Sequence, residues 1–470
     1  MAPVSVHSAD GDFGRLRAEF QLPDSFGPDV LAEAEASVGE TPAFSAERED
    51  ATGLPLVTVD PPGAKDLDQA LMIARRRDGF RVHYAIADVA GFVRPGGAVD
   101  REARRRGQTL YLPDGNVPLH PPVLAEDAAS LLPGEVRPAV LWTIDLDSGA
   151  EHVKSRVRRA WVRSTGQYDY EGVRAALETG TAHPSVAALP VLGVLRRQLA
   201  VSRGAVEPQL PEQAIAGDPG NGWMLGMRAR NDVEAWNAEI SLLTGMTAAS
   251  VMIEAGVGVL RTLPEPDEES VNWLRRSAHA LGITWPEGAG VSELLAGLDP
   301  GLPESMALYT CTTRLLRGAG YTAFEGEPPP STGHAGIGAP YSHVTAPIRR
   351  LVDRFAAEIC LAVSAGTPVP GWVRDALSEL PVVMSASDTL AARVERACID
   401  QVGAWMLTGL VGGTFEAVVL RAEEARAEIL VENPPVMGRC SGVNLPEGER
   451  IVVRLSAVDV EKRKVSFERA

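Results

Sequence analysis

The chain has 470 residues, 45% hydrophobic and 23% charged, a composition typical of a globular protein of two to four domains. No apolar run approaches the roughly 18 residues of a membrane helix, and the first residues do not resemble a secretory signal, so we expect no membrane association. The net charge of −17 argues against a uniformly nucleic-acid-binding surface. Local arginine clusters in DREARRRG, VKSRVRRAWVR and PIRRLVDR leave open either a solvated surface or a basic channel inside an acidic shell.

Residues 1–50 are rich in Ala, Glu and Pro, and the patterns FGRLRAEF and PDVLAEAEASV predict two short amphipathic helices. This helical segment is long enough for a very small domain of helix-turn-helix type or for an arm packed on the main body. The four cysteines are scattered without CxxC spacing, which favours a reducing compartment, and we therefore expect a cytoplasmic protein. No sequence feature indicates a partner chain, and we expect a monomer.

From about residue 54 to 163 the sequence alternates in the manner of β-strands, and one long strand pair is expected to turn back at Asp147–Gly149. From about 171 to 410 helical patterns dominate, including one that has Asp232 as its N-cap and runs to VGVL. From 411 onward, short strands separated by turn signals predict a small barrel of the OB type. The expected fold is thus α+β, with a helical segment at 1–50, a catalytic domain at 51–408 and an OB-fold domain at 411–470.

The stretch TVDPPGAKDLDQAL places three carboxylates, Asp60, Asp66 and Asp68, in one turn between two apolar strands. Carboxylates this close repel one another unless a cation neutralises them. Oxygen-only ligands suit Mg²⁺ or Mn²⁺, and such sites often serve phosphate chemistry. A purely structural turn, with each Asp capping the backbone, is the alternative interpretation.

The same stretch resembles the first signature of the ribonuclease II/RNase R (RNB) family, which reads Asp, five residues, Asp, one residue, Asp-Asp. YSHVTAPIRRLVDR is similar to the second signature, and segments between the two fall in family order. The tail is similar to the S1 RNA-binding domain that follows the catalytic domain. The resemblance spans about 52–470, and two separated motifs in the right order make it specific. It implies a mixed β-sheet core surrounded by helices, followed by an S1-type barrel.

The resemblance implies that Asp60, Asp66 and Asp68 are metal ligands for one or two Mg²⁺ ions, with Mn²⁺ as a substitute. Gln69 stands where the family has its fourth Asp, and we expect a weaker or indirect contact from it. Asp68 falls on the acid most critical for hydrolysis, and Asp66 is expected to share the catalytic role. Arg349 falls on the first arginine of the second signature, where its planar fork suits a phosphate oxygen.

Further residues are implied as RNA contacts. Tyr111 falls on the family tyrosine that stacks on the 3′-terminal base, and Glu239 falls on a glutamate associated with nucleotide positioning. Arg350 is expected to bind RNA beside Arg349. Four basic residues of the barrel replace aromatic stacking there and are expected to bind phosphate: Arg421, Arg439, Arg454 and Lys462. His343 and Glu395 are weaker candidates, the former as a core histidine near the site and the latter as a late catalytic acid.

The site residues depart from the family in three respects. Gln69 replaces an acid, Ala214 stands near the place of an aromatic base clamp, and Glu395 is about one helical turn out of register. Residues 1–50 cannot hold the two cold-shock domains of classical members, so we expect a more open RNA path that admits structured RNA with an accessible 3′ end as well as single strands.

The implied function is a Mg²⁺-dependent 3′-to-5′ hydrolytic exoribonuclease that degrades RNA to nucleoside 5′-monophosphates without sequence preference. Two alternatives remain at this point. The first is a non-catalytic RNA-binding protein on a degenerate RNB scaffold, which the three departures favour. The second is a phosphatase or a nuclease that acts on DNA or small nucleotides.

Overall fold

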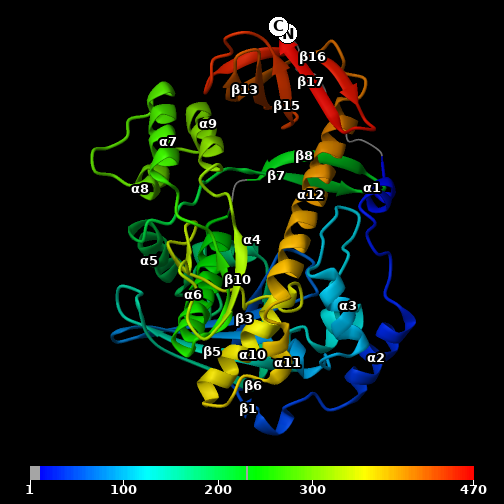
Figure 1. The fold of residues 1–470 in the computed structure, drawn as a ribbon, viewed down its shortest axis with the longest axis vertical. Helices are drawn as coiled ribbons and strands as arrows, with labels where there is room; N and C mark the ends of the chain where they lie inside the picture. Colours follow the sequence, from blue (N-terminus) through cyan, green and yellow to red (C-terminus); the bar gives the residue numbers. More distant parts are fainter. Residues whose placement is uncertain (1–10, 229–230) are drawn as a thin grey trace.

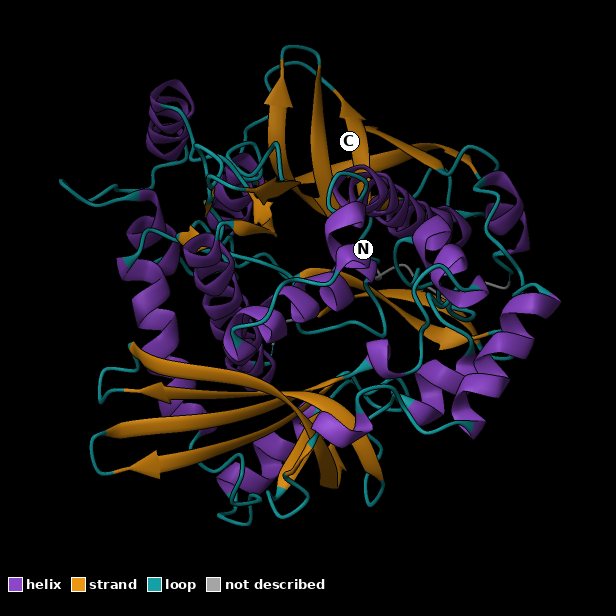
Figure 2. Ribbon diagram, turned by 60° about the horizontal axis from the view of Figure 1, so that its bottom comes forward, coloured by secondary structure: helices purple, strands orange, loops and turns teal. Residues whose placement is uncertain are grey.

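The centre of the protein is a mixed six-stranded sheet, seen in a computed structural model that describes residues 11–228 and 231–470. The strand order is β1-β6-β2-β3-β4-β5. The strands are β1 (Glu49–Asp50), β2 (Leu56–Val59), β3 (Gln69–Arg76), β4 (Gly79–Ala87), β5 (Val136–Leu146) and β6 (His152–Tyr168). They run side by side at the bottom of Figure 2, with helices above them. The sheet, its helices and the C-terminal barrel confirm the expected α+β class.

Strand β6 closes the sheet on itself, because it pairs with strands at both ends of the set. It runs antiparallel to β5 from Val136↔Arg163 onward and parallel to β2 at Val59↔Tyr168. The β5–β6 turn lies where the sequence predicted it. There the Asp147 Oδ1 atom accepts hydrogen bonds of 2.9 Å from the backbone N–H groups of Gly149 and Glu151, an arrangement typical of Asp in turns.

Helices cover the sheet and bury two clusters of apolar side chains. One cluster joins the sheet to α5 (Leu189–Ser202), α6 (Asp232–Ala255) and α10 (Leu351–Ala365). The other joins it to α2 (Pro28–Gly39), α3 (Ala98–Arg106) and a π-helical turn at Leu124–Ala128. Shorter elements are α4 (Tyr170–Glu178), β11 (Gly333–His334), β12 (Ala339–Pro340) and the 3₁₀ turns Ser45–Glu47 and Val89–Gly91. None of the described helices has an apolar stretch of the length needed to cross a lipid bilayer.

Helix α6 differs from the prediction at both ends. Its N-cap is Asn231, whose side chain accepts a 2.8 Å hydrogen bond from the Val233 N–H, so Asp232 is the first helical residue. The helix ends at Gly256, which adopts a left-handed conformation. The following VGVL forms β9 (Val257–Thr262) instead of more helix, and β9 pairs with β10 (Gly320–Glu325). In the sequence, three helices come between β9 and β10: α7 (Glu268–Ala280), α8 (Val291–Ala296) and α9 (Pro303–Thr312).

A β-hairpin formed by β7 (Glu212–Asp218) and β8 (Gly222–Arg228) lies in a region that the sequence predicted as helical. Its turn is held by Asp218, which accepts hydrogen bonds from the N–H groups of Gly220 and Asn221. Trp223 and Leu225 of β8 are buried against the last long helix. The turn residues and the tertiary contact therefore override the helical character of the neighbouring sequence.

The last long helix, α12 (Leu380–Leu407), follows α11 (Gly371–Ala376) and leads from the sheet region to the barrel (Figure 1). The barrel is closed in the order β13-β14-β15-β17-β16, as expected for an OB fold. Its strands are β13 (Thr414–Glu423), β14 (Arg426–Val431), β15 (Met437–Ser441), β16 (Arg450–Asp459) and β17 (Lys464–Arg469). The interior of the barrel shares one apolar cluster with α12 and the hairpin.

The described part of the N-terminal segment lies against the rest of the protein. Phe13 precedes α1 (Gly14–Glu19) and packs edge-to-face on Trp223 and Trp405, with ring centroids 5.4 Å away in each case. Glu19 forms two 2.8 Å hydrogen bonds with Arg463 of the barrel. This segment therefore contacts the hairpin, α12 and the barrel together.

We expect Phe13→Ala to weaken the docking of α1 by about 3 kcal/mol, because a fully buried aromatic ring is replaced by a cavity between two tryptophans. Amide hydrogen exchange of α1 measures the effect as faster exchange in the variant. Val382→Ala, at a position that is 70% exposed, is the matched control and should leave that exchange unchanged. Equal protection of α1 in both variants would contradict the assigned packing.

Candidate active site

The acidic turn connects β2 to β3 and is fastened at both ends. The backbone N–H of Asp60 donates a 3.0 Å hydrogen bond to the Tyr168 carbonyl at the end of β6. At the other end, the Leu67 N–H donates to the Ser130 hydroxyl, and the Asp68 carbonyl accepts from the Ala87 N–H. The closure of the sheet by β6 thus fixes where the three carboxylates lie.

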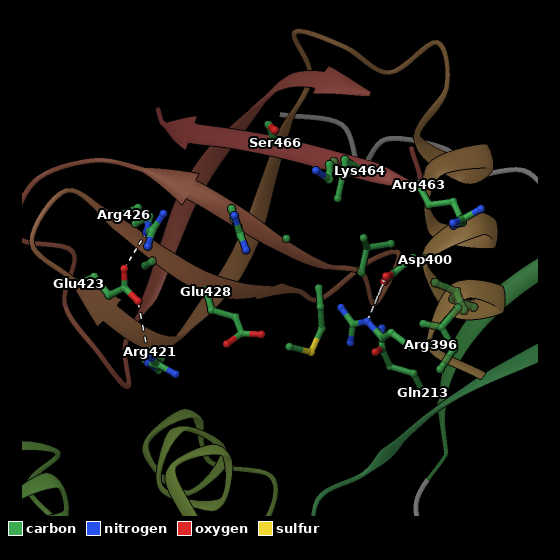
Figure 3. Close-up of a pocket in the computed structure, with 18 residues that line it drawn as sticks. Gln213, Arg396, Asp400, Arg421, Glu423, Arg426, Glu428, Arg463, Lys464 and Ser466 are labelled. Carbon is green, nitrogen blue, oxygen red and sulfur yellow. Dashed lines mark hydrogen bonds and ion pairs between the residues drawn. The ribbon is translucent and has the colours of Figure 1, made fainter. Parts of the chain in front are cut away.

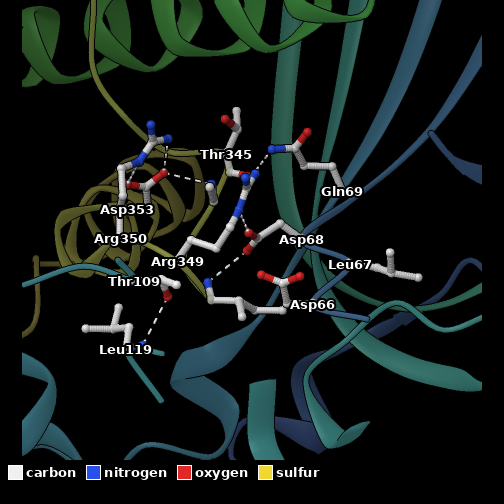
Figure 4. Close-up of polar contacts among 12 residues, drawn as sticks. Asp66, Leu67, Asp68, Gln69, Thr109, Leu119, Thr345, Arg349, Arg350 and Asp353 are labelled. Carbon is white, nitrogen blue, oxygen red and sulfur yellow. Dashed lines mark hydrogen bonds and ion pairs between the residues drawn. The ribbon is translucent and has the colours of Figure 1, made fainter. Parts of the chain in front are cut away.

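Asp68 is the most deeply buried acid of the turn, with 1% of its surface exposed. Its Oδ1 atom accepts a 2.8 Å hydrogen bond from the Ile348 N–H, and its Oδ2 atom accepts a 2.7 Å bond from the Arg349 Nε–H (Figure 4). Burial raises the pKa of Asp68 to about 6, although the Arg349 guanidinium acts in the opposite direction. The two sequence signatures therefore meet in one charge-assisted contact.

Asp60 contains a buried oxygen, Oδ2, without a hydrogen-bond partner among the described residues. The pKa of Asp60 is raised to about 7, chiefly by burial; the Arg349 charge lowers it, and the charges of Asp68 and Asp66 add to the rise. A buried carboxylate without a partner is costly. A bound cation would remove that cost, so the environment of Asp60 favours one.

Asp66 lies beside Tyr111, whose hydroxyl donates a 3.4 Å hydrogen bond to the Asp66 Oδ2 atom. Tyr111 is half exposed, and desolvation of its hydroxyl raises the pKa to about 12. Its loop is joined to the second signature because the Thr109 N–H donates a 2.9 Å hydrogen bond to the Arg349 carbonyl. The ring is therefore exposed next to the acidic turn, where an incoming base could stack on it.

Gln69 is the first residue of β3 and is hydrogen-bonded through both ends of its amide. Its Nε2 atom donates to the Thr345 carbonyl at 2.7 Å, and its Oε1 atom accepts from the Tyr84 hydroxyl at 2.7 Å. The Tyr84 hydroxyl also lies 2.7 Å from the Ser241 hydroxyl. Gln69 thus ties the acidic turn to the segment before Arg349, and a direct metal contact from it stays a prediction.

The segment that carries Arg349 and Arg350 is held by Asp353 in the first turn of α10. Asp353 accepts from the Ala346 N–H at 2.7 Å and from two nitrogens of Arg350 at 2.9 and 3.0 Å. The Arg350 guanidinium is therefore engaged within the protein. The Arg349 side chain is more exposed, at 38%, and is the better placed of the two to reach a ligand.

A cavity of about 430 Å³ opens beside these arginines and brings together several of the predicted residues. Glu239 of α6 lies in its wall and is 3% exposed, and the Glu239 Oε2 atom lacks a hydrogen-bond partner among the described residues. Burial raises the pKa of Glu239, while the charges of Arg196 and Arg203 lower it. Gln69, Arg349 and Arg350 also line this cavity.

His343 and Glu395 lie outside this arrangement. His343 is half-buried beside Tyr321, whose hydroxyl is 2.8 Å from the His343 Nδ1 atom, and desolvation of the imidazole keeps its pKa well below the ordinary value. It is thus a neutral packing residue, as expected of a core histidine. Glu395 is exposed on α12 close to Cys398, which packs toward the barrel, and it is absent from the described lining of the cavity.

The barrel presents a basic pocket of about 550 Å³ where it meets α12 and the hairpin (Figure 3). Six of its lining residues are cations: Arg396, Arg421, Arg426, Arg439, Arg463 and Lys464. Three acids, Asp400, Glu423 and Glu428, partly balance them. Two of the four predicted phosphate contacts, Arg421 and Arg439, belong to the pocket, whereas Arg454 and Lys462 lie outside its described lining.

Several residues of these two sites were not predicted from the sequence. Arg396 and Arg463 join the basic pocket because α12 and the β16–β17 turn approach the barrel face, which depends on tertiary packing. Tyr84 and Asp353 position the two signatures through hydrogen bonds. Asp353 could have been found, because it stands three residues after Arg350, a spacing at which helical side chains meet.

The oxygen ligands of the acidic turn suit a divalent cation, although the side chains are not arranged closely around a single position. Among residues 11–228 and 231–470, no group of three or more His, Cys, Asp or Glu side chains is gathered closely enough to hold a metal ion. The donors are nevertheless all oxygen, they repel one another, and one buried Asp60 oxygen lacks a partner. Arg349 supplies the positive charge that now balances Asp68.

Residues 48–363 match the RNB domain, and residues 413–470 match the RNase II-type exonuclease C-terminal S1 domain. Since the first match covers more than half of the chain, the protein belongs to the RNB family, and its carboxyl-terminal barrel is an S1 domain of the RNase II type.

Individual relatives agree with this assignment. The chain is 30% identical to the exosome complex exonuclease RRP44 homolog A of Arabidopsis thaliana over 77% of this chain and 40% of that protein. It is 27% identical to ribonuclease R of Escherichia coli strain K12 over 90% of this chain and 57% of that protein. The chain thus spans about half the length of these curated relatives.

The fold is shared with RNase R of Mycoplasma genitalium, solved in complex with ribose-methylated single-stranded RNA and with double-stranded RNA. The TM-scores are 0.86 and 0.80, at 20% and 21% sequence identity. The likeness covers 97% and 99% of this chain and 77% and 81% of those chains. At this identity the likeness establishes the fold.

We expect Asp60→Asn to stabilise the metal-free protein at about pH 8 by about 2–4 kcal/mol, because one pKa unit corresponds to 1.36 kcal/mol. In the folded protein the pKa of Asp60 is about 7, above its ordinary value of 3.8. The stabilising contribution of protonated Asp60 is therefore complete when the pH is below about 3.8. This contribution is lost as the pH rises through about 7. Denaturant unfolding in a chelator, compared at about pH 5 and about pH 8, should show the gain shrinking toward the lower pH.

Glu395→Gln is the control, because that carboxylate is exposed and should change stability little at either pH. Added Mg²⁺ should stabilise the wild-type protein more than D60N, since a cation bound only by the folded state raises stability. A loss of stability in D60N at about pH 8 would contradict the unfavourable environment assigned to Asp60.

Proposed function

We propose that the protein is a Mg²⁺-dependent 3′-to-5′ hydrolytic exoribonuclease that releases nucleoside 5′-monophosphates without sequence preference. The observation that carries the proposal is the contact of Arg349 with Asp68 at the acidic turn, beside a cavity and the exposed Tyr111 ring. Membership of the RNB family and the relatives named as exonucleases support it. The substrate is RNA, either single-stranded or structured with an accessible 3′ end.

Asp60, Asp66 and Asp68 would hold Mg²⁺, as expected for a family whose nucleases are in general metal-dependent. The metal, when bound, activates water and neutralises charge on the phosphate. The Arg349 guanidinium, whose side chain is 38% exposed, would turn toward a phosphate oxygen. There it stabilises the negative charge that develops during hydrolysis.

The remaining residues bind and orient the strand. Tyr111 stacks on the terminal base, a contact worth about 1–3 kcal/mol that accepts any base. Glu239 and Arg350 line the cavity that receives the strand preceding the terminal nucleotide. The basic pocket of the S1 domain holds phosphates farther along the strand. Recognition by stacking and phosphate contacts explains the proposed lack of sequence preference.

We propose that the protein acts in the cytoplasm and that it is a monomer. The four cysteines are all reduced and buried, which suits a reducing compartment.

A second candidate function, a non-catalytic RNA-binding protein, is favoured by Gln69. Its amide replaces a negative charge and is already hydrogen-bonded at both ends, so the turn has one acid fewer to offer a second metal. Asp68 and Arg349 are nevertheless both present and in contact, and they favour the nuclease.

We expect Asp68→Asn to lower the rate of RNA degradation at least about a hundredfold, because it removes one charged metal ligand and the anionic partner of Arg349. End-labelled poly(A) RNA with Mg²⁺ measures the rate as a ladder that shortens to mononucleotide or short products. RNA affinity, measured by gel shift, should be retained.

Asp127→Asn, at a surface ion pair with Arg137, is the matched control and should degrade RNA at the wild-type rate. Unchanged RNA that still shifts with the wild-type protein would identify the RNA-binding alternative. Degradation of an equivalent DNA at the same rate would instead indicate a nuclease without RNA preference.

We expect Arg439→Gln to reduce the steepness with which RNA affinity falls with salt, by about 0.7 in the log–log slope for one lost phosphate contact on a single strand. Arg454→Gln is the comparison, because its side chain is exposed outside the basic pocket and should change the slope less. Fluorescence anisotropy of a labelled RNA over a range of salt concentrations measures both slopes. A larger effect of R454Q would place the RNA path on the other face of the barrel.

A further inference from the structure

A second cavity, of about 580 Å³, adjoins the acidic turn and is separate from the one beside Arg349. It is enclosed by the N-terminal segment, the acidic turn and residues 116–126, and within the described chain no residue lines both cavities. Lining residues that define it are Phe26, Leu31, Lys65, Asp66, Asn116 and Ile348.

Asp68 lies at the boundary between the two cavities. Its Oδ1 atom is bound by the N–H of Ile348, which lines the second cavity, and its Oδ2 atom is bound by Arg349, which lines the first. Likewise, Asp66 faces the second cavity and Gln69 the first. A phosphate held at the acidic turn would therefore have one cavity on each side.

Hydrolysis from a 3′ end produces a nucleotide that must leave the site, and the second cavity can provide a way out. Water forms a new bond to phosphorus, the bond from phosphorus to the 3′ oxygen of the preceding nucleotide breaks, and that oxygen takes up a proton. The product is a nucleoside 5′-monophosphate enclosed between the acidic turn and the shortened strand. As long as the strand fills the first cavity, the product cannot leave by the way that it came.

We propose that the second cavity receives this nucleoside 5′-monophosphate and is its route of release. The inference rests on the proposed exonuclease function and adds a separate site for the product. It also gives the N-terminal segment a role, because residues 23–31 form one wall of the route.

The cavity suits a ligand that must bind weakly and leave. Its volume lies within the range of about 300–1,000 Å³ typical of small-molecule sites. Phe26, Leu31 and Ile348 offer apolar surface to a base or ribose. The charged lining residues balance, with three cations and three acids: Arg17, Lys65, Arg106, Asp24, Asp66 and Glu126. A balanced lining does not retain a dianion strongly, whereas a purely basic one would.

Arg106 fastens the N-terminal segment over this cavity. Its guanidinium donates to the Ser25 carbonyl at 2.8 Å and to the Pro118 carbonyl at 3.0 Å, and it lies 3.8 Å from the centre of the Phe26 ring. Ser25 and Asn116, which line this cavity from two different segments, are both exposed.

The test blocks the opening after the protein has folded. The four native cysteines are buried, so a bulky maleimide should label S25C protein at the new thiol. V153C, on an exposed part of β6, is labelled in the same way as the control. Enzyme in excess over a short end-labelled RNA is mixed with Mg²⁺ and quenched at intervals, which separates the first cleavage from later ones.

We expect labelled S25C to perform the first cleavage at the rate of labelled V153C and to perform later cleavages at least about tenfold more slowly, an increase of about 1.4 kcal/mol in the barrier for release. Unlabelled S25C should match the wild type, and labelled N116C, on another segment that lines the cavity, should repeat the pattern. N116C also replaces S25C if the latter does not fold.

Unchanged later cleavages, or a first cleavage slowed as much as the later ones, would overturn the proposal. Wild-type protein that degrades RNA in either case keeps the proposed function intact. Wild-type protein that degrades no RNA overturns both the function and the release route.

Discussion

The contact between Asp68 and Arg349 is the interaction on which the rest of the structure depends. It joins two segments that are 281 residues apart, and it is buried on the carboxylate side. Around it, Gln69 holds Thr345, Thr109 holds the Arg349 backbone, and Asp353 holds Arg350. The predicted catalytic residues are thus held by neighbours whose own positions are fixed by the sheet and by α10.

The same contact explains why the acidic turn is folded although its carboxylates repel one another. Burial raises the pKa values of Asp60 and Asp68 to about 7 and about 6. The Arg349 guanidinium beside Asp68 reduces the repulsion between the carboxylates without removing it. The turn therefore keeps an unfavourable charge arrangement that binding of a cation would relieve, in accordance with the way functional sites are often less stable than they could be.

The N-terminal segment, the hairpin and α12 are joined by one apolar cluster away from the acidic turn. Phe13 from the N-terminal segment, Trp223 from the hairpin and Trp405 from α12 meet beside the barrel. Because α12 is a single helix of 28 residues, it links this cluster to the sheet region as a rigid element. The position of the S1 domain, and with it the basic pocket, is therefore set by contacts that the N-terminal segment helps to form.

Local sequence patterns were sufficient to predict the α+β class, the turn between the long strands β5 and β6, and the terminal barrel. The meeting of the acidic turn with Arg349 was predicted from a resemblance to a family and not from periodicity, because no local rule brings residues so distant in sequence together. The hairpin at β7 and β8 was predicted wrongly, since its strands depend on burial of Trp223 against α12. The environment of Gln69 was also beyond sequence reasoning, because both of its partners come from other elements.

The position of Arg349 late in the chain has a consequence for the protein during its synthesis. The Asp60 backbone is held by Tyr168, but the Asp68 carboxylate is held by Ile348 and Arg349, so a nascent chain has made most of the RNB domain before this carboxylate has its partners. A ribosome-bound fragment would therefore carry the acids without the geometry that hydrolysis needs. Under the proposed function, the chain would be inert toward its own messenger RNA until translation has reached the residues near 349.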